Sequence, residues 1–125
     1  MSITVSTTLG NALLDLIDST INTDDPGSVQ FATSSTFSTV LAEITLNNPA
    51  FGSAADKTIA LDVDPALSAT VEENGTVSHF RFCDGTGTEV LRGTVGVSNA
   101  DWIFDVVEWV TGGTIIVNSG ELSVA

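Results

Sequence analysis

Short runs of alternating apolar and polar residues, each closed by a turn signal, fill this chain from residue 28 onward. One of them extends from Val40 to Leu46 and is broken by Asn47-Asn48-Pro49. Such alternation is typical of half-buried β-strands, and no helical stretch separates the runs, which excludes a parallel α/β fold. We therefore predict an all-β domain with one N-terminal helix, built as an antiparallel β-sandwich of jelly-roll-like form.

A β-hairpin is predicted from Val77 to Gly96. An aromatic-rich strand leads to a turn at Asp84-Gly85-Thr86-Gly87, and a second strand follows from Thr88 to Val95. Glycine takes the positive φ that tight hairpin turns require. The remaining predicted strands lie around residues 29–31 and over residues 58–63, 67–71, 102–107, 114–118 and 121–124.

The predicted helix covers about residues 8–22, with Thr7 or Thr8 as its cap and Asn22 at its end. One face is polar and carries Asn11, Asp15, Asp18 and Ser19. The other is an apolar stripe, which we expect to pack on a sheet or on a neighbouring subunit. Its members are Leu9, Ala12, Leu13, Leu16, Ile17 and Ile21.

A chain of 125 residues can bury one core but is too short for two. We predict a single domain over residues 1–125, with the helix at about 8–22 and the β-sandwich at about 28–125. The side chains expected to form the core are Leu13, Leu16, Ile17, Ile44, Leu46, Phe80, Phe82, Leu91, Phe104 and Ile116.

The charge balance is strongly acidic, with a net charge of −13 from 16 acids against Lys57, Arg81 and Arg92. Three scattered cations cannot form the basic footprint that binds nucleic acid or an anionic membrane, so we predict neither partner. Two interpretations of the acidity stay open: solubility, or complementarity to a basic protein. Charged residues are only 15% of the chain, and the resulting hydroxyl-rich surface is common on proteins that assemble.

The chain's first residues carry neither a basic segment nor an apolar one, so no signal peptide is expected. No run approaches the length of a membrane span. We expect folding in a cytoplasm. The single cysteine, Cys83, lies in an apolar strand and is predicted to be a buried hydrophobe and not a reactive thiol.

Candidate catalytic and metal-binding residues are few. Asp62 and Asp64 share one side of a strand, but the loop after them lacks the ligands that calcium needs. His79 has no second histidine or cysteine at ligand spacing. The Asp84 turn has a glycine where an aspartic protease loop would need threonine. We predict no catalytic residue, no metal and no cofactor, and therefore no enzyme.

Four aromatic residues are candidate interface residues. Trp102 and Trp109 are seven positions apart, so on one continuous strand they would face opposite sides, one in the core and one exposed. Phe37 and Phe51 lie in the two irregular segments, Ala32–Thr39 and Pro49–Asp56. We expect these two loops and the helix to contribute to a contact surface.

Four ordered motifs span most of the chain: Leu9-Gly10-Asn11-Ala12-Leu13-Leu14-Asp15 in the helix, Leu41 to Gly52, the Phe80 to Gly85 hairpin, and Gly112-Gly113-Thr114. Their order resembles a family of small bacteriophage virion proteins of the head-decoration or cement type. The resemblance implies a virion component. Combined with the small β domain, the sparse charge and the strong acidity, it leads us to expect a decoration or cement protein, made in the host cytoplasm, that self-associates as a homotrimer and binds the major capsid protein on the outside of the head. Two alternatives are a tail or baseplate module that binds glycan, and a non-catalytic accessory or inhibitor domain.

Overall fold

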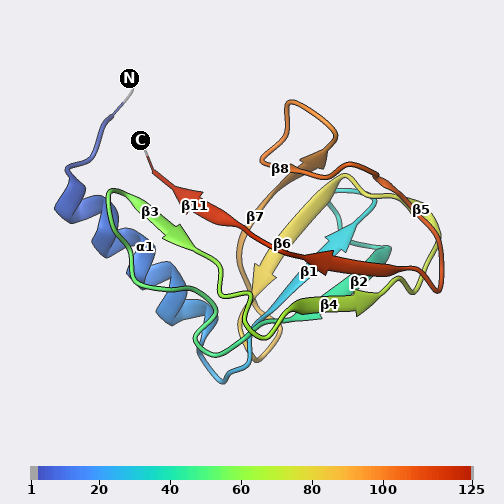
Figure 1. The fold of residues 1–125 in the computed structure, drawn as a ribbon, viewed down its shortest axis with the longest axis horizontal. Helices are drawn as coiled ribbons and strands as arrows, with labels where there is room; N and C mark the ends of the chain where they lie inside the picture. Colours follow the sequence, from blue (N-terminus) through green and yellow to red (C-terminus); the bar gives the residue numbers. More distant parts are fainter. Residues whose placement is uncertain (1–2, 125) are drawn as a thin grey trace.

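The structure, a computed structural model, describes residues 3–124 of the chain. These residues form one helix and eleven strands (Figure 1). Their bounds are α1 (Thr7–Ile21), β1 (Ser28–Ala32), β2 (Val40–Thr45), β3 (Thr58–Ala60), β4 (Leu67–Thr70), β5 (Gly75–Thr76), β6 (His79–Cys83), β7 (Glu89–Gly96), β8 (Trp102–Ile103), β9 (Glu108–Trp109), β10 (Thr114–Val117) and β11 (Glu121–Ser123). The prediction of a mostly β chain with one N-terminal helix is confirmed.

The largest sheet has five strands in the order β2-β1-β6-β7-β8. Its neighbours are antiparallel except β7 and β8, which run parallel through Val95–Trp102 and Gly96–Ile103. The sheet is therefore mixed, and the expectation of purely antiparallel pairing is wrong at this edge. Register shifts after Phe31 and Phe82 are β-bulges, which increase the local twist and curl the sheet.

Three two-stranded ladders complete the fold: β4–β10, β3–β11 and β5–β9. The chain after β4 is joined to the large sheet where Glu72 N–H donates to the carbonyl of Leu41 at 2.8 Å. Figure 1 shows β10 and β11 crossing the view of the large sheet, with α1 at one end of the molecule beside β3. Buried residues of the large sheet and of these smaller ladders belong to one hydrophobic core.

The predicted hairpin is confirmed as β6 and β7, and its turn uses two glycines differently. Gly87 has a φ of +88°, the left-handed conformation that favours glycine. At Gly85 the need is space, because a Cβ would lie 1.5 Å from the Asp24 carbonyl oxygen. Asp84 Oδ1 completes the turn by accepting from the main-chain N–H groups of Thr86 and Thr88 at 2.9 and 3.0 Å.

Aromatic rings fill the centre of the core. The ring of Phe31 has centroid distances of 5.3 Å to Trp102, 5.5 Å to Phe104 and 5.4 Å to Trp109. Trp102 also lies almost parallel to Phe82, at 6.1 Å. Offset and edge-to-face contacts of this kind add to the stabilisation from apolar burial.

The predicted core is confirmed in part. Ile44, Leu46, Phe80 and Phe82 are buried, whereas Ile17, Leu91 and Phe104 are partly buried against the core. Three predictions are wrong, because Leu13, Leu16 and Ile116 are 39%, 61% and 55% exposed. For Ile116 the error is one of register: β10 pairs Ile116 with Ser68 and Val117 with Leu67, and it is Val117 that is buried.

The helix has the predicted extent, but Ser6 caps it in place of Thr7 or Thr8, with its hydroxyl accepting from Leu9 N–H at 3.1 Å. Asn22 forms the C-cap as predicted. Gly10 brings α1 close to its neighbours, since a Cβ there would lie 2.7 Å from Cγ of Lys57. The residues that α1 buries are Gly10, Leu14 and Ile21.

The face that α1 presents to the protein differs in part from the predicted stripe, of which Ile21 is buried and Ile17 partly buried, because the polar side chains also face the protein. Its polar side chains accept hydrogen bonds from four main-chain N–H groups of the loop between β2 and β3. The pairs are Asn22 with Ala50 at 3.0 Å, Asp18 with Phe51 at 2.9 Å, Asp15 with Ala54 at 3.0 Å, and Asn11 with Lys57 at 2.8 Å. Because main-chain donors must be satisfied, the polar face binds the loop, and Leu9, Leu13 and Leu16 of the apolar stripe are left exposed.

Candidate functional site

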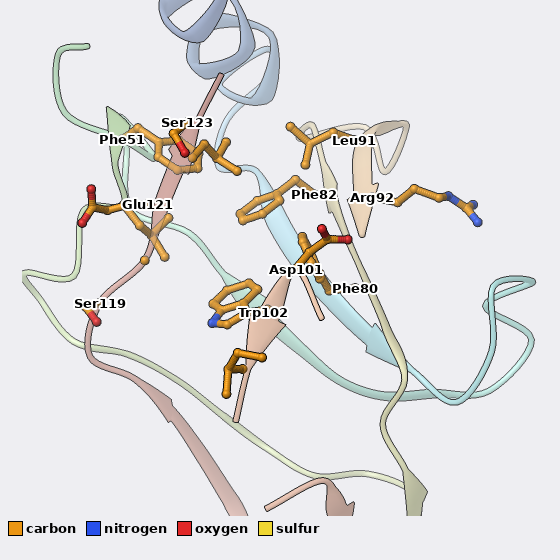
Figure 2. Close-up of a pocket in the computed structure, with 14 residues that line it drawn as sticks. Phe51, Phe80, Phe82, Leu91, Arg92, Asp101, Trp102, Ser119, Glu121 and Ser123 are labelled. Atoms are coloured by element: carbon orange, nitrogen blue, oxygen red, sulfur yellow. The ribbon is translucent and has the colours of Figure 1, made fainter. Parts of the chain in front are cut away.

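A cleft of about 580 Å³ opens between β11 and the edge of the large sheet formed by β7 and β8. Figure 2 shows Glu121 and Ser123 of β11, with Ser119 just before this strand, on one side, and Leu91 and Arg92 of β7 on the other. Between them lie aromatic and aliphatic side chains. The apolar residues that line the cleft are Phe51, Leu61, Phe80, Phe82, Leu91, Trp102, Ile103 and Leu122.

The charged residues on the rim differ in their availability. Arg92 is occupied, since its Nη2 lies 2.7 Å from Oε1 of Glu89 and its Nη1 donates to the Ser35 carbonyl at 2.6 Å. Asp101 accepts from Thr94 N–H at 2.9 Å and keeps an exposed carboxylate, while Glu121 is exposed. The rim therefore offers negative charge to a ligand.

Phe37 and the two arginines form a stacked cluster beside β6 and β7. The guanidinium carbons of Arg81 and Arg92 lie 4.4 and 5.0 Å from the centre of the Phe37 ring. Glu89 bridges the two arginines, and hydrogen bonds from Arg92 hold the pKa of the Glu89 carboxyl below its usual range. The contacts fix the Ala32–Thr39 loop on the sheet.

The third cation is also occupied, because Lys57 Nζ donates to the Val5 carbonyl at 2.7 Å. Arg81 Nε likewise donates to Oε1 of Gln30 at 2.8 Å. All three basic side chains are therefore held by oxygen atoms of the chain itself.

The polar residues weighed as catalytic or metal ligands are scattered. His79 Nδ1 lies 2.7 Å from the hydroxyl of Ser78, which also bonds the Thr33 carbonyl at 2.7 Å. Asp62 accepts from Asp64 N–H at 3.0 Å, a local turn contact. Among residues 3–124, no group of three histidine, cysteine or acidic side chains is placed to hold a metal ion. That the chain is not an enzyme stays a prediction.

Cys83 is buried as predicted. Burial raises the pKa of its thiol above the ordinary value, because the thiolate would lose its hydration. The thiol is therefore held in its unreactive, protonated form.

Three of the four candidate interface residues are buried in the chain: Phe37 at 7% exposed, Phe51 at 2% and Trp109 at 5%. Trp102 is partly buried and lines the cleft. The two tryptophans lie on separate strands and both contact Phe31, so the argument from one continuous strand does not apply to them. Only Trp102 retains a surface that a partner could meet.

The structure exposes two apolar surfaces, of which the first belongs to the helical stripe named from the sequence and the second was not located there. The helix patch is formed by Leu9, Leu13 and Leu16, which are 49%, 39% and 61% exposed. The strand patch is formed by Val106, Val110 and Ile116, which line a shallow hollow of about 400 Å³ and are 62%, 66% and 55% exposed. Clustered apolar exposure of this kind marks contact surfaces.

No helix within residues 3–124 has the length and apolar character to cross a membrane. Comparisons with protein-family models, curated proteins and solved structures gave no match to this chain.

Proposed function

We propose that this chain is a bacteriophage capsid decoration protein, which binds the major capsid protein on the outer surface of the assembled head. The observation that supports this most directly is the orientation of α1. Its polar face holds the loop between β2 and β3, and three of its four leucines, Leu9, Leu13 and Leu16, are exposed. Such an arrangement gives the helix patch no partner within the described chain, and an assembly would supply one.

The energetics favour a role in assembly. Burying a leucine side chain completely is worth about 1.5–3 kcal/mol, so the three leucines of the helix patch offer several kcal/mol to a contact. A protein that binds the assembled lattice and not the free subunits stabilises the lattice by mass action. The charge of −13 favours a basic partner surface.

We further propose that the protein self-associates as a homotrimer and that its two layers form a jelly-roll-like sandwich. The small ladders β3–β11 and β4–β10 would be the second layer, facing the large sheet across the core. Closed symmetry would place the strand patch against a neighbouring copy and the helix patch against the capsid.

The experiment is cryo-electron microscopy of virions of the phage that encodes the chain. Density at regular positions over the whole head, with trimers at threefold points, is expected. Density only at the tail, or a few copies per particle, would refute the decoration role. Catalytic activity of this chain in the virion would contradict the proposal that it is purely structural.

A matched pair of variants tests the helix patch. We expect the triple variant Leu9→Gln, Leu13→Gln and Leu16→Gln to fold with an unchanged unfolding midpoint and to lose binding to capsids that lack the protein. The control is Val97→Thr, because Val97 is 58% exposed and belongs to neither patch. Equal capsid binding by both variants would exclude the helix patch as the contact.

A further inference from the structure

The cleft beside Trp102 lies between two strand edges that have no strand neighbour. β11 pairs with β3, where Leu61 N–H donates to the Gly120 carbonyl and Val124 N–H donates to the Lys57 carbonyl. Gly120 and Val124 therefore turn their main-chain groups toward this neighbouring chain segment. In an antiparallel ladder, every second residue turns its main-chain groups away from the partner strand. Glu121 and Ser123 therefore direct their N–H and carbonyl groups away from β3, on the side of the cleft.

The facing edge is β7. Val95 N–H donates to the Ser78 carbonyl, so the same alternation turns the main-chain groups of Arg92 and Thr94 away from β6. Thr94 N–H is taken by the carboxylate of Asp101 at 2.9 Å. β8 pairs only with Val95 and Gly96, which leaves the earlier part of this edge open. Within the described chain, the main-chain groups of Arg92 have no strand partner.

Unpaired edges are templates for an added strand, and proteins use them to bind extended peptides. Here the two edges border one cleft of mixed lining, with Phe82 and Trp102 at its centre and polar residues such as Asp101 and Glu121 around them (Figure 2). A strand lying in the cleft would direct every second side chain toward this lining and the others to solvent. It would also bridge the large sheet and the β3–β11 ladder.

We propose that the cleft accepts an extended segment of a different protein as an added β-strand between β7 and β11. Its alternate side chains are aliphatic, and basic residues flank it. The basic flanks are argued from the rim, where Asp101 and Glu121 are exposed acids and Arg92 is already paired with Glu89. A cation beside Glu121 would form a cross-strand pair.

A second copy of this chain fits the cleft poorly. Its three basic side chains are all held internally, and each copy brings a charge of −13. The proposal goes beyond the decoration role and does not depend on it, because any protein partner could donate the strand. If microscopy of virions refutes the decoration role, the strand site is still tested separately by the peptide titration described next.

The probe is the synthetic peptide Lys-Val-Thr-Val-Thr-Val-Lys, titrated into the full-length, isotope-labelled protein and followed by NMR. We expect saturable binding below about 1 mM, with slowed hydrogen exchange at the amides of Arg92, Glu121 and Ser123. The same peptide with both threonine nitrogens methylated should bind at least about tenfold more weakly, since it loses the two central donors for one edge.

Two variants separate strand pairing from general adhesion. Ser123→Pro removes an N–H that faces the cleft and should weaken binding about tenfold, whereas the matched control Ser123→Ala keeps the N–H and should bind normally. The unmodified protein should prefer this peptide over Glu-Val-Thr-Val-Thr-Val-Glu. Glu121→Lys should have the opposite preference, by about threefold in affinity. If Ser123→Pro fails to fold, the change in amide hydrogen exchange of the unmodified protein on peptide binding still tests the proposal.

Several outcomes would overturn the proposal. These are absence of binding at about 1 mM, equal binding of the methylated peptide, or shifts confined to residues outside the cleft. Tighter binding of the chain's own segment Ile3-Thr4-Val5-Ser6-Thr7 would assign the cleft to a second copy. A glycan-array signal lost in Trp102→Ala, with no peptide binding, would assign it to carbohydrate.

Discussion

Asp18 Oδ1 accepts the main-chain N–H of Phe51 at 2.9 Å, so a residue near the end of α1 holds a loop that follows it by more than thirty positions. The same oxygen accepts from Nδ2 of Asn22 at 3.1 Å. Phe51 is buried, and its ring lies 5.6 Å from that of Phe82. One carboxylate thus links the orientation of the helix to the position of an aromatic side chain in the core.

Replacing Asp18 with alanine is expected to cost about 1–3 kcal/mol of unfolding free energy, because the Phe51 N–H is part-buried and would lose its acceptor. Asp18→Asn keeps a carbonyl oxygen and should cost less than about 1 kcal/mol. Urea unfolding at neutral pH measures both. Equal losses would mean that the negative charge, and not the accepted hydrogen bond, sustains the contact.

Leu14 and Leu13 are adjacent on α1, and the structure predicts opposite outcomes for them. Leu14 is 1% exposed and should lose about 2–5 kcal/mol on change to alanine. Leu13 is 39% exposed, so its change to alanine should alter the unfolding free energy by less than about 1 kcal/mol. Similar values for the two variants would show that the apolar stripe packs inward after all.

The extent of α1 could be predicted from helical periodicity, but its orientation could not. Both a polar and an apolar stripe run along the helix, and periodicity does not say which one the protein covers. That was decided by main-chain donors such as Phe51 and Ala54, which are distant in the sequence. The spacing of Asn11, Asp15, Asp18 and Asn22 on one helix face was the available signal.

The hairpin was predictable because its strands and turn are local, whereas the cleft joins segments that no local pattern connects. Its walls come from residues 91–92, 101–103 and 119–123. The placement of Trp102 and Trp109 failed for the related reason that the chain between them is not one strand. Position in a sheet depends on pairing partners, and spacing alone does not supply them.

The Asp84 turn gives the protein a pH-dependent contribution to stability. Hydrogen bonds from Thr86 and Thr88 lower the pKa of Asp84 in the folded state. A depressed folded-state pKa contributes stability that is present above the unfolded value, about 3.9, and is lost as pH falls through the folded value. We expect Asp84→Asn to narrow the difference between urea midpoints measured at neutral pH and in acid.

Comparison with the unmodified protein is essential here, since protonating other acids also relieves the repulsion within a chain of charge −13. The control is Asp64→Asn, a change at an exposed acid outside this turn. If the stability of Asp84→Asn depends on pH in the same way as that of the unmodified protein, the Asp84 turn does not contribute to the pH dependence.

Cys83 should be protected from alkylation in the folded protein. Its side chain is fully buried, and burial raises its thiol pKa, so both access and thiolate formation oppose reaction with iodoacetamide. We expect labelling to be slow in buffer and to become fast in urea at the concentration where the protein unfolds. Mass spectrometry of timed samples measures this, and the destabilised Leu14→Ala variant should label faster than Leu13→Ala. Rapid labelling of the unmodified protein in buffer would show that the β6 end of the hairpin opens on its own.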